Sequence, residues 1–179
     1  MYVAIDIETT GLNPQTDQIL EVAAVANCKD KRVIDCPTFH EVVKQERIQG
    51  TPQALSMNAE LIKKISDGEG RLLAAVMWRL RNFLESLEQD EFIAVGSNVG
   101  SFDMQFLKME TGFPCELFSH RSLDINSLYA DNNGVANHKG IEAGVAKKFD
   151  IPGKPHQALY DSRLALALMR SKFWGHHAK

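Results

Sequence analysis

The stretch that decides the fold is Val3-Ala4-Ile5-Asp6-Ile7-Glu8-Thr9-Thr10-Gly11-Leu12, near the start of the chain. Its large apolar residues alternate with Ala4, Asp6 and Glu8, which is the two-residue period of a β-strand. A turn over residues 9–14 is predicted to end this strand, because it contains glycine and proline. Asp6 and Glu8 therefore share one face, about 7 Å apart at the backbone. They stand at the carboxyl end of the strand, where open α/β sheets bind ligands; a strand that simply runs out into solvent is the alternative explanation.

The composition indicates one compact domain. The chain has 179 residues, of which 44% are hydrophobic and 24% are charged. We assign residues 1–174 to this domain and residues 175–179 to a short C-terminal tail. No stretch approaches about 18 uninterrupted apolar residues, and the N-terminus enters a strand directly, so neither a membrane span nor an export signal is expected. The three cysteines suit neither a disulfide framework nor a zinc site, which favours a reducing, cytoplasmic location.

The net charge of −3 argues against a long footprint on duplex DNA, because neutralising many phosphates requires an excess of lysine and arginine. A short contact with nucleic acid remains compatible with this charge. Basic residues gather in the last quarter of the chain, where an ordinary solvated surface is the alternative explanation: Lys139, Lys147, Lys148, Lys154 and Arg163.

The hydrophobic patterning predicts strands first and then alternating helices and strands, which is typical of the α/β class. Strands are expected over residues 3–8, 19–26, 32–43, 92–96 and 117–123. The first three follow one another directly and indicate a meander. Helices are expected from residue 58 to residue 87 and over residues 101–110, 124–130, 138–149 and 158–173.

Two aspartates are predicted to turn inward from helices. Asp161 lies three and four residues before Leu164 and Ala165, which puts its carboxylate on the apolar stripe of its own helix. Asp103 likewise precedes Phe106 by three residues. A buried carboxylate must be protonated, paired or bound to a cation. A first-turn acid favoured by the helix dipole is the alternative explanation for Asp161.

His156 lies five residues before Asp161, so the two cannot share a face of one helix, since five helical steps rotate by about 140°. The histidine is expected in the lead-in after Pro155, from where its imidazole can reach over Asp161. Four convergent carboxylates suit two-metal phosphodiester hydrolysis, because hard divalent cations take oxygen ligands. A base that titrates near neutrality would then supply proton transfer.

Three segments carry these residues in a fixed order. They are Asp6-Ile7-Glu8-Thr9-Thr10-Gly11-Leu12 with Ile19-Leu20-Glu21-Val22-Ala23-Ala24-Val25, then Asn98-Val99-Gly100-Ser101-Phe102-Asp103-Met104-Gln105-Phe106-Leu107, and last His156-Gln157-Ala158-Leu159-Tyr160-Asp161-Ser162-Arg163. Together they resemble the three motifs of the DnaQ-like DEDDh 3′→5′ exonucleases, and the similarity covers essentially the whole chain. The resemblance implies an RNase H-like fold, a five-stranded mixed sheet flanked by helices, whose second strand is antiparallel to the others.

The resemblance also implies roles for the acidic residues. Asp6, Glu8 and Asp161 would hold the metal that carries the attacking water, and Asp6 would bridge to a second ion. Asp103 would act mainly through the waters of that second ion. Both ions would be Mg²⁺ or Mn²⁺, and His156 would take the proton of the water.

Five residues are assigned to the substrate by the same resemblance. The backbone around Thr9 and Thr10 would receive the terminal 3′-hydroxyl. Leu12 and Phe102 would pack against the last bases, as stacking on single strands permits. Asn98 is assigned a substrate role, although it stands five residues before the aspartate of its motif, where many relatives have the asparagine four before.

The expected activity is removal of 5′-mononucleotides from the 3′ end of DNA that is single-stranded or frayed. DNA is favoured over RNA by resemblance alone. One alternative is an exoribonuclease like RNase T or oligoribonuclease, which contacts with the 2′-hydroxyl would distinguish. Another is a proofreading subunit that works with a separate polymerase. No membrane partner is expected.

Overall fold

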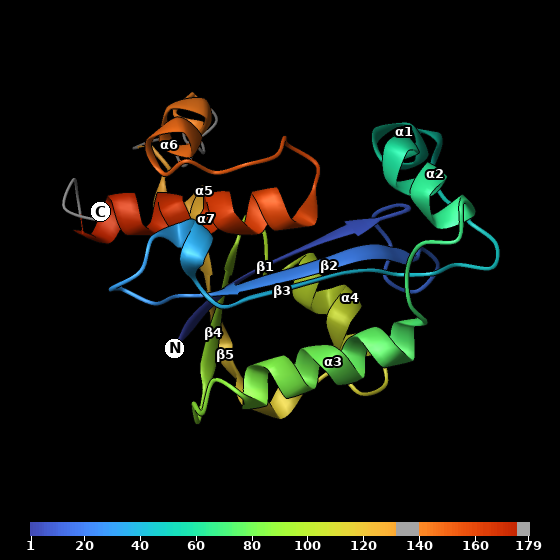
Figure 1. Cartoon of the computed structure of the whole chain (residues 1–179), viewed down its shortest axis with the longest axis horizontal. Coiled ribbons are helices and arrows are strands. Elements are labelled where there is room, and N and C mark those ends of the chain that lie inside the picture. Colours follow the sequence, from blue (N-terminus) through green and yellow to red (C-terminus); the bar gives the residue numbers. More distant parts are fainter. Residues whose placement is uncertain (132–139, 175–179) are drawn as a thin grey trace.

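The computed structural model describes residues 1–131 and 140–174, and its centre is a five-stranded sheet (Figure 1). The strands are β1 (Tyr2–Thr9), β2 (Ile19–Ala26), β3 (Thr38–Val42), β4 (Phe92–Gly96) and β5 (Phe118–Asp124). Their order in the sheet is β3-β2-β1-β4-β5. β2 runs antiparallel to β1 and β3, whereas β1, β4 and β5 are parallel. The predicted mixed sheet with an antiparallel second strand is confirmed.

Helices cover both faces of this sheet (Figure 1). They are α1 (Pro52–Met57), α2 (Ala59–Ser66), α3 (Leu73–Glu85), α4 (Asp103–Met109), α5 (Ile125–Leu128), α6 (Glu142–Lys148) and α7 (Ala158–Trp174). Short 3₁₀ turns occur at Val33–Asp35 and Cys115–Leu117. No helix in the described part of the chain is long and apolar enough to cross a membrane.

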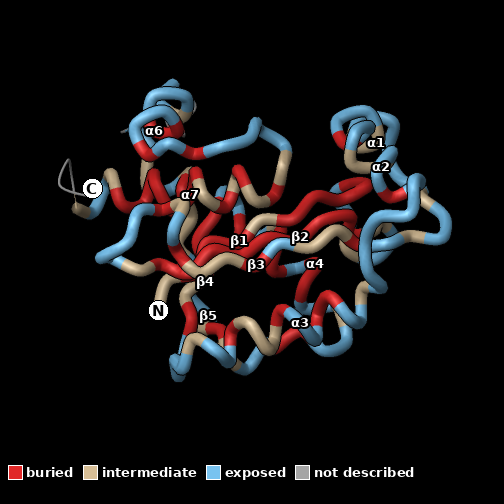
Figure 2. Tube along the Cα trace, viewed as in Figure 1, coloured by how far each residue is buried: buried red, intermediate tan, exposed pale blue. Residues whose placement is uncertain are grey.

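The two faces of β1 belong to different apolar clusters. Val3, Ile5 and Ile7 pack in one cluster with residues of α3 and α4. Ala4 packs in the other cluster, with residues of α6 and α7. Figure 2 shows the central strands as buried backbone between these helical layers. Since side chains of a strand alternate between faces, Asp6 and Glu8 share the Ala4 face, toward α7.

The predicted third strand is shorter than its sequence suggested. Residues 32–43 were expected to be extended, but Val33–Asp35 forms a 3₁₀ turn before β3 begins at Thr38. The guanidinium of Arg32 binds the carboxylate of Asp35 at 2.6 Å, which favours the local turn. Pro37 then offers no amide hydrogen to a ladder. Only the second half of the predicted strand therefore pairs.

Helical structure begins earlier than the apolar pattern predicted. Thr51 caps α1 by accepting a hydrogen bond from the amide of Ala54 at 3.3 Å, and Pro52 occupies the first helical position. The segment around α1 is largely exposed, so apolar periodicity gave no signal for it. The predicted helix over 138–149 is observed as α6, although residues 138–139 and the predicted tail 175–179 lie outside the described residues.

Candidate active site

The carboxyl end of β1 carries two acidic side chains on its α7 face, as the alternation predicted. Glu8 is buried, with 8% of its surface exposed, and Asp6 is half-buried. Glu8 pairs in register with Glu21 on β2, so a third carboxylate stands directly beside it. Cross-strand neighbours on one face lie about 5 Å apart at Cβ, and like charges there repel.

Asp103 joins this end of the strand from α4. It is the first residue of that helix, it is only 2% exposed, and its Oδ1 accepts the amide hydrogen of Ile7 at 3.0 Å. The bond fixes the start of α4 against the backbone between Asp6 and Glu8. The prediction that Asp103 turns inward is confirmed.

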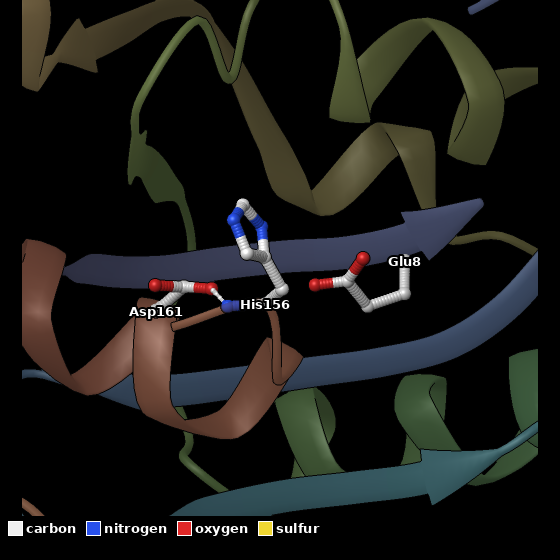
Figure 3. Close-up of side chains that lie close together, drawn as sticks. All are labelled: Glu8, His156 and Asp161. Atoms are coloured by element: carbon white, nitrogen blue, oxygen red, sulfur yellow. Dashed lines mark hydrogen bonds between the residues drawn. The ribbon is translucent and has the colours of Figure 1, made fainter. Parts of the chain in front are cut away.

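Asp161 and His156 approach from the start of α7. The helix begins at Ala158, so His156 lies in the lead-in, as the spacing predicted. His156 has a left-handed backbone, with φ 62°, and its amide donates to Oδ2 of Asp161 at 2.8 Å (Figure 3). The histidine is exposed and the aspartate is half-buried. The hydrogen bond folds the lead-in back over the first turn of the helix.

The three motifs meet in space. Glu8, His156 and Asp161 each place one potential ligand atom within 4.8 Å of the others (Figure 3). The residues come from opposite ends of the chain and are brought together where α7 lies on β1 and β2. Asp6, His156 and Asp161 also line one cavity of about 160 Å³.

The electrostatics of the strand residues is unfavourable for negative charge. Burial raises the pKa of Glu8 to about 7, the charges of Asp161 and Glu21 add to this, and the Asn58 amide opposes it. Burial raises the pKa of Asp6 well above its usual value, followed by the charges of Asp103 and Asp161. Both carboxyls therefore resist ionisation where they stand.

The two helix residues show the same tendency. Burial raises the pKa of Asp103 to about 7, against hydrogen bonds from backbone amides, including that of Ile7. Burial also raises the pKa of Asp161 to about 6, opposed mainly by the backbone amide of His156. Divalent cations with oxygen ligands would relieve both the burial and the repulsion. The donor set therefore fits hard divalent ions.

A larger cavity, of about 780 Å³, opens beside the acidic residues. Glu8 and Thr9 of β1, Leu12 of the following turn and Phe102 before α4 line it, with residues of α1 on the other side. Leu12 is 81% exposed, although it is a large apolar residue. A mostly apolar cavity of this size suits a flat organic group such as a nucleobase.

Two of the predicted substrate residues do not line this cavity. Thr10 is fully buried, and its amide donates to the carbonyl of Gln18 while its hydroxyl accepts from the Gln18 amide. Asn98 has φ 57°, and its Oδ1 accepts a hydrogen bond from the side-chain amide of Asn126. Both residues therefore hold turns near the site.

Two residues of the site were not singled out from the sequence. Asn58, at the junction of α1 and α2, is buried and donates from Nδ2 to the carbonyl of Thr9 at 3.1 Å. Glu21 is 7% exposed and faces the acidic residues from β2. The sequence could have indicated Glu21, because it is the one charged residue in an apolar strand. No local sequence pattern could indicate Asn58, since its hydrogen bond joins residues 49 positions apart.

Comparisons with known proteins agree with this geometry. A family model described as "Exonuclease" matches residues 3–169. The DNA polymerase III PolC-type of Thermotoga petrophila is 30% identical over an alignment of 177 positions, and the match covers 91% of this chain and 11% of that protein. The chain thus spans about a tenth of the length of the polymerases it matches.

Solved structures match the fold over nearly the whole chain. Exonuclease I of E. coli in complex with a dA16 oligonucleotide aligns with a TM-score of 0.66 and 15% identity, covering 96% of this chain and 41% of that one. A 3′-exonuclease that recognises the histone mRNA stem-loop aligns with a TM-score of 0.64 and 16% identity, covering 99% and 83% of the two chains. The RNase H-like architecture is confirmed.

Proposed function

This chain belongs to the exonuclease family, the DnaQ-like group that its three motifs resemble, and we propose that it removes 5′-mononucleotides from the 3′ end of DNA. The observation that carries the proposal is the convergence of Glu8, His156 and Asp161 within 4.8 Å, beside the carboxylates of Asp6 and Asp103. The three motifs are far apart in the sequence, so this convergence is a property of the fold.

The four carboxylates would hold two divalent ions, Mg²⁺ or Mn²⁺. When bound, such ions neutralise phosphate charge and make water more acidic. Asp6 and Glu8 are anchored on the strand, whereas Asp103 and Asp161 close the site from two helices. Their raised pKa values support cation binding, because an ion stabilises the ionised form that burial disfavours.

His156 serves as the general base. Its imidazole, exposed in the lead-in to α7, takes a proton from the attacking water. The water oxygen bonds to phosphorus as the bond from phosphorus to the 3′-oxygen of the next nucleotide breaks. That oxygen takes a proton from solvent and becomes the new 3′ end, and the phosphate leaves on the released mononucleotide.

The larger cavity would hold the terminal nucleotide. Leu12 and Phe102 offer apolar surface to the last bases, and the backbone of Thr9 is close enough to Glu8 to receive the 3′-hydroxyl. Contacts of this kind tolerate any base, since every base has an apolar face. We infer that Thr10 and Asn98 support this cavity by holding its turns.

DNA is the preferred substrate in this proposal because the sequence relatives are DNA polymerases, and a separate polymerase is a possible partner for the same reason. An exoribonuclease is the second candidate, because one structural neighbour is a 3′-exonuclease that recognises an mRNA stem-loop. The cytoplasmic location expected from the cysteines stays a prediction.

Matched DNA and RNA oligonucleotides labelled at the 5′ end test polarity and substrate together. With Mg²⁺, we expect a ladder that shortens from the 3′ end, faster for DNA than for RNA, and no digestion in excess EDTA. Immediate release of the labelled nucleotide would mean attack at the 5′ end. A single labelled fragment of intermediate length, with no ladder above it, would mean an endonuclease.

A further inference from the structure

Glu21 is a buried carboxylate that stands beside the acidic residues, and both of its oxygens are already bound. Oε2 accepts the amide hydrogen of Ala158 at 2.8 Å, and Oε1 lies 2.6 Å from Nε2 of His40. Only 7% of Glu21 is exposed. With both oxygens committed to protein donors, Glu21 is poorly suited to bind a cation.

The Ala158 amide makes a long-range hydrogen bond at the start of α7. Ala158 is the first residue of α7, so its amide has no carbonyl acceptor within the helix. Its acceptor comes instead from β2, 137 residues away in the sequence. His156 lies two residues before this anchor and Asp161 lies three residues after it. This bond therefore ties to β2 the segment that supplies both of these groups to the site.

His40 fixes the orientation of the Glu21 carboxylate. It stands opposite Ala23 in the register of β2 and β3, on the same face of the sheet as Glu21. Because the carboxylate can only accept, Nε2 of His40 must carry the hydrogen between them. Glu21 is thus held from one side by His40 and holds α7 on the other.

The backbone of the anchored segment needs such support. His156 has a positive φ, a conformation that non-glycine residues adopt only where neighbouring contacts enforce it. Every residue from Pro152 to His156 is exposed, so apolar packing contributes little to the position of this segment. Its position depends on polar contacts. The Ala158 amide binds Glu21 and the His156 amide binds Asp161, while Lys154 binds Gln157 through its amide and Glu60 through its exposed ammonium group.

We propose that Glu21 is a positioning residue, which anchors the start of α7 to β2 and thereby places His156 for proton transfer. The inference rests on the proposed exonuclease function and adds to it a fifth acidic residue with a role other than metal binding. In this proposal the side chain at position 21 must accept a hydrogen bond from the Ala158 amide, and it need not carry a negative charge.

The kinetic test compares Glu21→Ala with Glu21→Gln on a single-stranded DNA oligonucleotide with Mg²⁺. Glu21→Ala should lower kcat by about 10- to 100-fold with KM changed less than about three-fold, because a displacement of about 1 Å at a catalytic group has effects of this size. Glu21→Gln keeps an acceptor for the Ala158 amide and should retain activity within about three-fold of the unchanged protein.

The matched control is Glu41→Ala. Glu41 lies on β3, on the opposite face of the sheet, where it binds Arg71 and Arg79. Its removal also takes a partly buried carboxylate from the sheet, but it should leave kcat unchanged. Equal losses in Glu21→Ala and Glu41→Ala would mean that destabilisation of the sheet explains both, and would overturn the proposal.

Amide hydrogen exchange gives a readout that does not need activity. The Ala158 amide should be protected in the unchanged protein and in Glu21→Gln, and it should exchange at least about ten-fold faster in Glu21→Ala. Unchanged exchange in Glu21→Ala would overturn the anchor. Equal kinetic losses in Glu21→Gln and Glu21→Ala would show that charge is what matters. If the unchanged protein digested no nucleic acid, the exonuclease function would be refuted. The exchange rate of the Ala158 amide would still show whether Glu21 anchors the start of α7.

Discussion

The acidic residues and the histidine segment are built in opposite ways. Asp6 and Glu8 belong to a strand packed between two apolar clusters, and Asp103 is bonded to the backbone of the same strand. His156 lies on an exposed lead-in with a left-handed backbone, held mainly by hydrogen bonds. A site that binds cations needs its ligands fixed against mutual repulsion, and the core provides that. A group that exchanges protons with water needs access to solvent, which the lead-in provides.

This contrast predicts that the two regions respond differently to substitution. Asp6→Ala should have the largest effect, a loss of at least about 1,000-fold in the rate of nucleotide release, because a two-ion site without a shared ligand cannot stabilise the transition state. Thermal unfolding should show no loss of stability, since the substitution removes a repelling charge from a crowded site.

Asp35→Ala is the matched control, because this exposed aspartate forms an ion pair with Arg32 and lies in the 3₁₀ turn before β3. It should leave the rate unchanged. Full activity in Asp6→Ala would contradict the assignment of Asp6 to the metal site.

His156→Ala should lower the rate by about 100-fold or more, which is the usual contribution of a general base. The dependence of the rate on pH should also change, because the group that accepts the proton of the water has been removed. His120→Ala, at an exposed position on β5, is the matched control and should keep both the rate and the pH profile. A pH profile unchanged by loss of His156 would assign the proton transfer to another group.

Leu12→Ala should act on binding instead of chemistry. Removing this exposed apolar side chain from the rim of the larger cavity should raise KM by about ten-fold with little change in kcat, since base stacking contributes about 1–3 kcal/mol. Leu72→Ala removes an equally large side chain that is 65% exposed elsewhere, and it should leave KM unchanged. A fall in kcat alone would place Leu12 with the catalytic residues.

The acidic residues also predict how stability depends on pH in the absence of metal. The folded pKa values of Glu8 and Asp103 are about 7 and that of Asp161 is about 6, all above their unfolded values. Their contribution is therefore fully present below about pH 4 and is lost as pH rises through 6 and 7.

Without metal, the Tm should fall by several degrees between pH 5 and pH 8, since each 1 kcal/mol of lost stability lowers the Tm of a domain of this size by roughly 2–4 °C. Mg²⁺ should restore the Tm at pH 8 and have little effect at pH 5, where protons compete for the carboxylates. A Tm that rises with pH in EDTA would contradict the raised pKa values.

The sequence predicted the acidic part of the site better than its surroundings. Alternation in β1 placed Asp6 and Glu8 on one face, and helical spacing turned Asp103 inward, because local periodicity determines both. The contacts of Asn58 and Glu21 join residues 49 and 137 positions apart, so no local pattern could reveal them. The start of α1 was missed because its exposed residues show no apolar period.

The most direct test is whether the acidic residues bind the metal while His156 does not. It is made by calorimetric titration of Mn²⁺ into the unchanged protein, Asp6→Ala and His156→Ala at pH 8. Glu8, His156 and Asp161 are close enough to bind one ion together, so the histidine could in principle be a ligand. We predict that His156→Ala binds two Mn²⁺ ions with nearly unchanged affinity and that Asp6→Ala loses most of the binding. Loss of metal binding in His156→Ala would make the histidine a ligand and contradict its role as the base.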